Sequence, residues 1–196
     1  MARTYGALVL AGGQARRMGG QNKALLELDR QTFLARLEKS LECFEERLLS
    51  ANDPALAVGT TFRPIPDRIP GRGPLEGLAA ALAACESDAL LVVPCDVPLF
   101  PAGLAQALVE AAGDQESLIC RDRAGRLHPL CGVYAKSCLS VADRLLAQGH
   151  FRALCLHEMV RGGVLSLENT PFPDRVLTNV NTRADLEALK NGQSPS

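Results

Sequence analysis

The sequence predicts a three-layer α/β fold, in which helices cover both faces of a mostly parallel, twisted sheet that includes a small antiparallel element. Two apolar runs, at residues 7–10 and 88–95, lack the alternation of a half-exposed strand and are typical of strands buried on both faces. Amphipathic segments separate the apolar runs, which favours βαβ connections between parallel strands. A charged turn at residues 121–126 indicates a hairpin, and hence the antiparallel element.

Length and composition favour one compact domain. The chain has 196 residues, of which 47% are hydrophobic and 22% are charged. This suits a single core over residues 1–190, with residues 191–196 as a disordered end. The formal net charge of −1 gives no general attraction for nucleic acid or for an anionic membrane, so we expect neither as a partner. We also expect a monomer.

The start of the chain and its cysteines both point to the cytoplasm. The start lacks the long apolar region and cleavage site of a secretory signal, and no run reaches the roughly 18 apolar residues of a membrane helix. The seven cysteines form no Cys-x-x-Cys pair. This pattern favours reduced core cysteines over a metal site or disulfides.

The strand predicted at residues 7–10 ends in Ala11-Gly12-Gly13, which leaves the backbone bare enough for a phosphate group to approach closely. Consecutive N–H groups in such a turn bind anions, and positive charge is added by Arg16, Arg17 and Lys23. We interpret the pattern as a triphosphate site, although the P-loop motif and the Gly-x-Gly-x-x-Gly turn are both absent. A glycine turn that serves only packing is the alternative.

The same residues carry a resemblance to a known family. The run Leu10-Ala11-Gly12-Gly13, with the later Arg17-Met18-Gly19 and Lys23, resembles the signature of the sugar-nucleotide and cofactor nucleotidyltransferases. It most resembles the molybdenum cofactor guanylyltransferases, which make molybdopterin guanine dinucleotide. The resemblance implies that Arg17 and Lys23 are catalytic, and that the nucleotide is bound by Leu10, Ala11, Gly12, Gly13 and Lys23. Asn22 departs from the family, which commonly has Asp there.

The next predicted elements are an amphipathic helix at residues 32–44 and a strand at residues 47–51. Because the carboxyl ends of parallel strands meet at one edge of a sheet, Ser50 and Asn52 should face the same crevice as Gly12. The resemblance implies that Ser50 and Asn52 contact the nucleotide, although the family has Asn in place of Ser50. An ordinary polar turn is the alternative.

A short edge strand at residues 63–67 closes with Asp67, and the glycine-rich loop 69–77 leads into a helix at about residues 75–85. Asp67 and loop backbone groups could read a base there, since a carboxylate accepts two hydrogen bonds from guanine N1–H and N2–H₂. In the resembled family, Gly-Pro-Leu-x-Gly occurs in guanylyltransferases, and Gly73 begins that run here. The resemblance therefore implies GTP, with Asp67 and Gly73 in its binding site.

The buried strand at residues 88–95 leads directly to Asp96. A carboxylate at the end of such a strand can reach the phosphates and hold Mg²⁺, which takes one or two carboxylates plus phosphate oxygens. We therefore predict Asp96 as metal ligand, nucleotide contact and catalytic residue, with Mg²⁺ as cofactor. The resemblance agrees, because Cys-Asp-x-Pro lies at the family's metal-binding strand end. A turn-forming Asp before Pro98 is the alternative.

The remaining elements follow from helical spacing and short apolar runs, with helices at residues 101–112, 136–148, 151–161 and 183–189 and strands at 117–120 and 164–167. The resemblance implies that the acceptor is bound by His128, Asn179 and Asn181. Asn181 could also offer a carbonyl oxygen to Mg²⁺. The alternative is that these residues have purely structural roles. Thr182 and Asp185 in particular are typical of a helix N-cap with an acidic first turn.

The resemblance implies transfer of GMP from GTP to the terminal phosphate of molybdopterin or the molybdenum cofactor, with release of pyrophosphate. Molybdenum-cofactor biosynthesis and delivery proteins are then candidate partners. Three alternatives stay open: a nucleotidyltransferase for a sugar or alditol phosphate, a molybdopterin cytidylyltransferase, and a non-enzymatic nucleotide-binding protein. Gly13 and the run at residues 73–77 disfavour the cytidylyltransferase.

Overall fold

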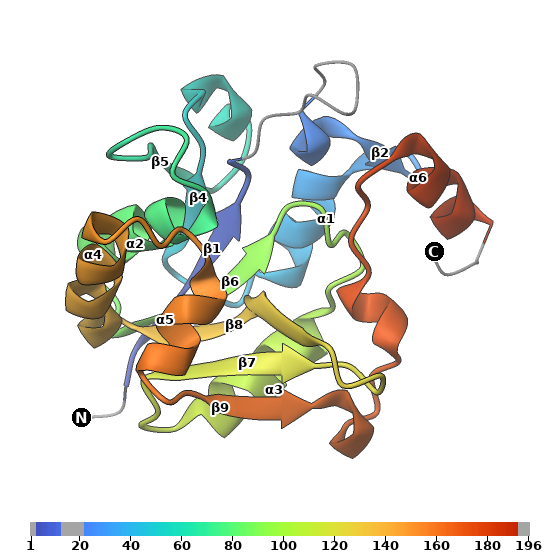
Figure 1. Cartoon of the computed structure of the whole chain (residues 1–196). Coiled ribbons are helices and arrows are strands. Elements are labelled where there is room, and N and C mark those ends of the chain that lie inside the picture. The colour runs from blue at the N-terminus through green and yellow to red at the C-terminus, as the bar shows by residue number, and fades with distance from the viewer. Residues whose placement is uncertain (1–2, 13–21, 192–196) are drawn as a thin grey trace.

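A seven-stranded sheet forms the centre of the computed structural model, which describes residues 3–12 and 22–191 (Figure 1). Its strands follow the order β5-β4-β1-β6-β8-β7-β9. They are β1 (Tyr5–Leu10), β4 (Arg47–Ser50), β5 (Arg63–Ile65), β6 (Ala89–Pro94), β7 (Ser117–Arg121), β8 (Leu127–Ala135) and β9 (Gly163–Ser166). Strand β8 pairs antiparallel with β6 and β7, and the other pairings are parallel, so the sheet is mostly parallel as predicted.

Helices cover both faces of this sheet. They are α1 (Phe33–Ser40), α2 (Pro74–Ala84), α3 (Ala102–Ala112), α4 (Leu139–Ala147) and α5 (Ala153–Met159). A further helix, α6 (Arg183–Lys190), packs in a separate cluster with Leu28 and Phe33. Buried residues of α1 and α3 pack on one face, and those of α2, α4 and α5 pack on the other. Along β1, Val9 points into the first layer and Leu8 into the second, which explains why the strand is apolar without alternation. The predicted three-layer α/β fold is confirmed.

Two details differ from the sequence prediction. The helix expected at residues 32–44 ends at Ser40, although Leu41 and Phe44 remain buried in the turn that follows. A second, two-stranded sheet joins β2 (Glu27–Leu28) and β3 (Gln31–Thr32). Its turn uses two non-glycine residues with positive φ, Asp29 and Arg30, so the usual glycine signal of a hairpin was missing. This small sheet lies beside α6 (Figure 1).

Five of the seven cysteines are buried, as expected for core cysteines. Burial raises the pKa of the thiols of Cys95, Cys120 and Cys138 to about 12, so they stay protonated at neutral pH. Within the described part of the chain, no helix is both long and apolar enough to cross a membrane.

His157 is the buried ionisable group that links a helix to the sheet. Its side chain is on α5, it is 4% exposed, and its Nδ1 lies 2.9 Å from the Ser117 hydroxyl at the start of β7. Burial lowers the pKa of His157, because the charged imidazolium is poorly solvated there. The unfolded chain therefore binds this proton more readily than the folded one.

Acidification should therefore cost stability through His157. Its contribution is fully present above the unfolded pKa of about 6.5 and is lost as the pH falls below it toward the lowered folded pKa. His157→Asn keeps a polar atom for Ser117 but cannot titrate, so its free energy of unfolding should fall less between pH 7.5 and 5. Urea unfolding at both pH values measures this. Equal losses in variant and wild type would show that His157 does not titrate on unfolding.

Candidate functional site

The parallel register brings four predicted site residues into one row. Leu10 pairs with Ser50 on one side and with Pro94 on the other, and Ser50 pairs with Ile65. In each strand, the residue two positions after this common level is a predicted site residue: Gly12 after Leu10, Asn52 after Ser50, Asp96 after Pro94 and Asp67 after Ile65. The row therefore runs Asp67, Asn52, Gly12, Asp96 across strands β5, β4, β1 and β6. All four lie at the carboxyl edge of the sheet, where open α/β folds bind ligands.

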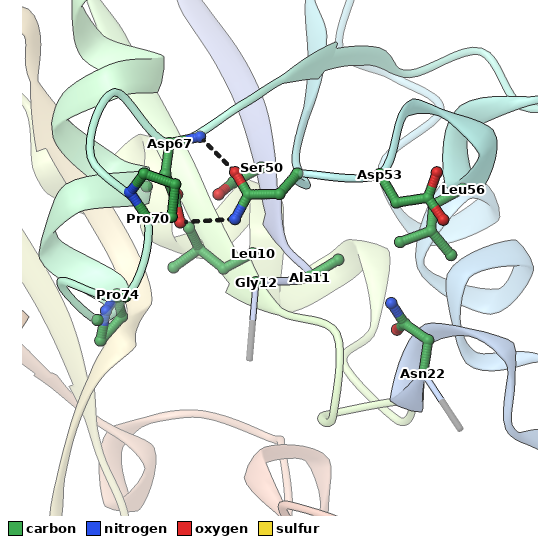
Figure 2. Close-up of a pocket in the computed structure, with 14 residues that line it drawn as sticks. Leu10, Ala11, Gly12, Asn22, Ser50, Asp53, Leu56, Asp67, Pro70 and Pro74 are labelled. Carbon is green, nitrogen blue, oxygen red and sulfur yellow. Dashed lines mark hydrogen bonds between the residues drawn. The ribbon is translucent and has the colours of Figure 1, made fainter. Parts of the chain in front are cut away.

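A cavity of about 510 Å³ is lined by three of the four residues of this row, all except Asp96 (Figure 2). The predicted nucleotide residues that line it are Leu10, Ala11, Gly12, Ser50, Asn52, Asp67 and Gly73. Asn22 also lines it, although the sequence pattern gave it no role beyond its departure from the family. The volume falls within the range of small-molecule sites in proteins.

Asn52 and Asp67 form a paired unit in this cavity. Asn52 Nδ2 donates to Asp67 Oδ2 over 2.9 Å, and Asn52 Oδ1 accepts from the Asp67 backbone N–H over 2.9 Å (Figure 2). The carboxylate is thus oriented by its neighbour while it keeps lone pairs for a ligand. Asp67 is half-buried. The residues were predicted separately, and their pairing is visible only in the fold.

Glycines at the start of α2 and within it shape this part of the cavity. Gly73 caps the helix with a φ of 72°, a conformation that side chains rarely adopt. A Cβ at Gly77 would lie 2.4 Å from the Ser50 hydroxyl oxygen, so only glycine allows this approach. Ser50 is 1% exposed and forms part of the floor.

Lys23, Asp96 and Asn181 form a cluster next to the cavity. Lys23 Nζ lies 3.0 Å from Asp96 Oδ2 and donates to Asn181 Oδ1 over 2.6 Å. Lys23 begins a short 3-10 helix, Lys23–Leu25; Asp96 follows the end of β6, and Asn181 lies in the segment before α6. A backbone hydrogen bond from Val180 N–H to the Asp96 carbonyl, 2.8 Å long, holds the last two segments together. Three residues far apart in sequence thus meet at one ammonium group.

Asp96 has the chemistry of a metal ligand. Its Oδ1 is buried and accepts no hydrogen bond from a described residue, whereas Oδ2 accepts one from Lys23. A buried carboxylate oxygen without a donor is costly unless a cation or water satisfies it. Residues 3–12 and 22–191 contain no group of three or more His, Cys, Asp or Glu side chains suited to a metal. A cation at Asp96 would therefore complete its coordination with water or substrate oxygens, as small hard cations do.

A second hollow, of about 270 Å³, lies on the other side of this cluster. All three residues predicted to bind the acceptor line it, namely His128, Asn179 and Asn181. Asn181 also contacts Lys23, so the hollow adjoins the cluster directly. Arg126 and Arg175 line it as well, and neither forms an ion pair with a described residue. Three carboxylates, those of Asp122, Asp174 and Asp185, line the same hollow, so an anionic group would have to bind directly beside the arginines.

Neighbouring carboxylates hold the lining of this hollow in place. Burial raises the pKa of Asp122, but hydrogen bonds from His128 and from the Arg126 backbone outweigh it and hold the pKa below its usual value. Burial likewise raises the pKa of Asp185, and hydrogen bonds from the Asn181 and Thr182 N–H groups outweigh it. The predicted cap of α6 thus also positions the backbone of Asn181.

Three predicted residues, Gly13, Arg16 and Arg17, lie outside the described residues, as does the predicted C-terminal end beyond Asn191. Sequence reasoning missed Asp122 as the partner of His128, and it gave Arg126 and Arg175 no role. The hairpin turn that carries Asp122 and Arg126 was recognised, but its charges could not be placed at the carboxyl edge without the strand order.

Comparisons with known proteins show the family and the fold. A family model described as the MobA-like NTP transferase domain matches residues 7–161. The chain is 34% identical to a probable molybdenum cofactor guanylyltransferase from Carboxydothermus hydrogenoformans, over 92% of both chains. It is 32% identical to one from Clostridium perfringens, over 93% of this chain and 94% of that one. Molybdopterin-guanine dinucleotide biosynthesis protein A from Archaeoglobus fulgidus has the same fold, with a TM-score of 0.77 at 23% identity over 94% and 96% of the two chains.

Lys23 should compete with free metal ions for Asp96. Its ammonium contacts Asp96 Oδ2, so a cation approaching that carboxylate meets a like charge. Lys23→Met should therefore raise the affinity for free Mn²⁺ about tenfold, which corresponds to about 1.4 kcal/mol. Electron paramagnetic resonance titration measures the free ion. Lys190→Met removes an exposed lysine paired with Glu187 and should change nothing. An unchanged or lower Mn²⁺ affinity in Lys23→Met would contradict the prediction.

Proposed function

The chain belongs to the family of MobA-like NTP transferases, and we propose that it transfers GMP from GTP to the terminal phosphate of molybdopterin, releasing pyrophosphate. Both relatives described above carry the name of this activity. The observation that carries the proposal is the continuity of the site. A cavity large enough for a nucleoside, the cluster of Lys23, Asp96 and Asn181, and a hollow with two arginines follow one another along one sheet edge.

In this proposal, the base and ribose of GTP occupy the cavity of about 510 Å³, called the larger cavity below. The carboxylate of Asp67 accepts hydrogen bonds from guanine N1–H and N2–H₂. The hydrogen bond from Asn52 keeps this carboxylate turned toward the cavity. Gly12 leaves the backbone open to the phosphates, which then extend from the cavity toward Lys23. Asn22 supports this path, since it lines the cavity and directly precedes Lys23 in the chain.

The reaction takes place at the α-phosphate beside the cluster. The acceptor phosphate attacks in line from the side of the smaller hollow, and pyrophosphate leaves, so no side chain forms a covalent intermediate. Lys23 exchanges its contact with Asp96 for phosphate oxygens and offsets their charge. Arg17, outside the described residues, keeps the phosphate-binding role that the resemblance implies. Positioning and charge therefore supply the catalysis.

We propose Mg²⁺ as the cofactor. Asp96 would hold it through the oxygen that accepts no hydrogen bond from a described residue, and Asn181 would offer a neutral oxygen. Bound there, the ion would neutralise charge on the phosphates and orient them.

The acceptor occupies the smaller hollow in this proposal. Arg126 and Arg175 supply positive charge for its phosphate, and Asn179 and Asn181 supply amide groups for hydrogen bonds. His128 is held by Asp122 over 3.0 Å and presents a fixed ring to the same space.

We further propose that residues 1–190 act as one domain in the cytoplasm. One seven-stranded sheet joins strands from Tyr5 to Ser166, and the two-stranded sheet of β2 and β3 lies within the same span of the chain. Protonated core thiols suit a reducing compartment.

Pyrophosphate release tests the function directly. The protein is incubated with Mg²⁺ and molybdopterin, together with GTP, CTP or ATP in turn. We expect release with GTP that depends on molybdopterin, and formation of molybdopterin guanine dinucleotide. Preferred use of CTP would identify a cytidylyltransferase instead. Release with a sugar phosphate but not with molybdopterin would identify a different acceptor, and binding of GTP without any transfer would indicate a non-enzymatic protein.

Asp96→Asn should abolish turnover at fixed Mg²⁺ while it leaves metal-free GTP binding close to wild type. The substitution removes the charge that holds the metal but almost no volume. Turnover should fall by at least about a hundredfold, as for the loss of one strong electrostatic contact to a reacting group. Asp88→Asn is the matched control, because Asp88 precedes the other end of β6 and contacts Thr4 instead. Normal turnover of Asp96→Asn at saturating Mg²⁺ would remove Asp96 from the metal site.

Asp67→Ala should collapse the preference for GTP over ATP. Adenine presents an acceptor where guanine presents N1–H, so the half-buried Asp67 loses both hydrogen bonds at a cost of about 1 to 2 kcal/mol. The wild type should therefore prefer GTP at least about tenfold in kcat/KM. The variant should lose GTP use while its weak use of ATP stays the same. Equal losses for both nucleotides would place Asp67 in the phosphate site or the fold.

A further inference from the structure

The loop between β5 and α2, residues 66–73, carries much of the larger cavity. Asp67, Pro70, Gly71 and Gly73 all line it. Yet residues 66–72 form no backbone–backbone hydrogen bond with another described residue. Backbone hydrogen bonds normally fix such a segment, so side chains must hold this one.

Side-chain contacts of two adjacent residues hold the loop. Asp67 bonds to Asn52 at the end of β4. Arg68 bonds to the two helices on that face of the sheet: its Nε donates to Glu76 Oε1 of α2 over 2.9 Å, and its Nη1 donates to Asp143 Oδ1 of α4 over 2.8 Å. The loop is therefore held at consecutive positions by the sheet and by the helical layer.

Glu76 is an unusually firm anchor for Arg68. It is 1% exposed and lies in the first turn of α2, where the helix dipole favours a negative charge. A carboxylate buried to this degree stays charged only when it is paired. The planar guanidinium also suits the task, since it donates in two directions at once to Glu76 and Asp143, which a lysine ammonium does less specifically.

We propose that Arg68, through Glu76, is a positioning residue for base selection: the pair fixes the 66–73 loop so that Asp67 meets the base in one orientation. This inference rests on the proposed function, because it assigns the loop to the base of the nucleotide. Arg68 does not line the cavity, so its effect is transmitted through the backbone of Asp67.

The test uses Arg68→Met combined with Glu76→Gln, which removes the ion pair without leaving a buried charge unpaired. Calorimetry gives the dissociation constants for GTP, ATP and pyrophosphate, and steady-state kinetics gives kcat and KM. Arg63→Met is the matched control, because it removes another Arg–Glu ion pair at the opposite end of β5. In that pair, Arg63 Nη2 lies 2.9 Å from Glu46 Oε1. Thermal unfolding of each variant reports lost stability separately.

We expect the double variant to bind GTP about tenfold more weakly, as loss of a preorganised contact predicts, with pyrophosphate binding unchanged and kcat nearly unchanged. Its preference for GTP over ATP should fall toward that of Asp67→Ala. Adding Asp67→Ala should reduce the preference no further, because both changes act on one interaction. Arg63→Met should keep wild-type binding and preference.

Two results would overturn the inference. Wild-type GTP binding in the double variant would show that the loop does not need the pair. Parallel weakening of GTP and pyrophosphate would show that the pair acts through the fold. The wild-type protein tests the proposed function separately, since equal binding of GTP and ATP would refute guanine selection. In that case, the dissociation constants still show whether the Arg68–Glu76 pair positions the loop. If it does, the double variant binds nucleotides more weakly than the wild type does, while it binds pyrophosphate equally well.

Discussion

The parallel register of β5, β4, β1 and β6 is the constraint on which the site depends. Ile65, Ser50, Leu10 and Pro94 stand at one level in four neighbouring strands. The chain leaves the sheet just beyond that level, so the functional residues emerge side by side. A shift of one position in any strand would turn its side chains to the other face of the sheet. Strands buried on both faces make such a shift costly, and the core thereby fixes the geometry of the site.

Charge balance is the second condition for this site. Lys23 compensates Asp96 within the described structure, and the smaller hollow combines two arginines with three carboxylates. In the proposed reaction, a triphosphate and its metal would replace the contact between Lys23 and Asp96, so that neither charge would be left unpaired. The loop at residues 66–73 also depends on a charge pair, because the buried Glu76 is paired with Arg68, the residue next to Asp67. Electrostatic pairing thus links the elements that surround the site.

Local patterns were sufficient for much of the fold. The strands at residues 7–10 and 88–95, the helix after Gly73 and the cap at Thr182 all follow from apolar spacing, glycine and capping chemistry. The helix expected to reach Phe44 ended at Ser40, because burial of Leu41 and Phe44 does not require helical backbone. The hairpin at Asp29 and Arg30 was missed, because side chains in the left-handed region leave no sequence signal as clear as glycine.

The sequence by itself determined the fold class, the ends of the main strands and most of the residue types at the site, because these depend on neighbours along the chain. Only the tertiary structure decided which residues meet. Asn52 orients Asp67, Asp122 holds His128, and Asn181 joins Asp96 around Lys23. Lys23 and Asn181 are 158 positions apart in the sequence. Their meeting follows from strand order and register, which no local pattern encodes.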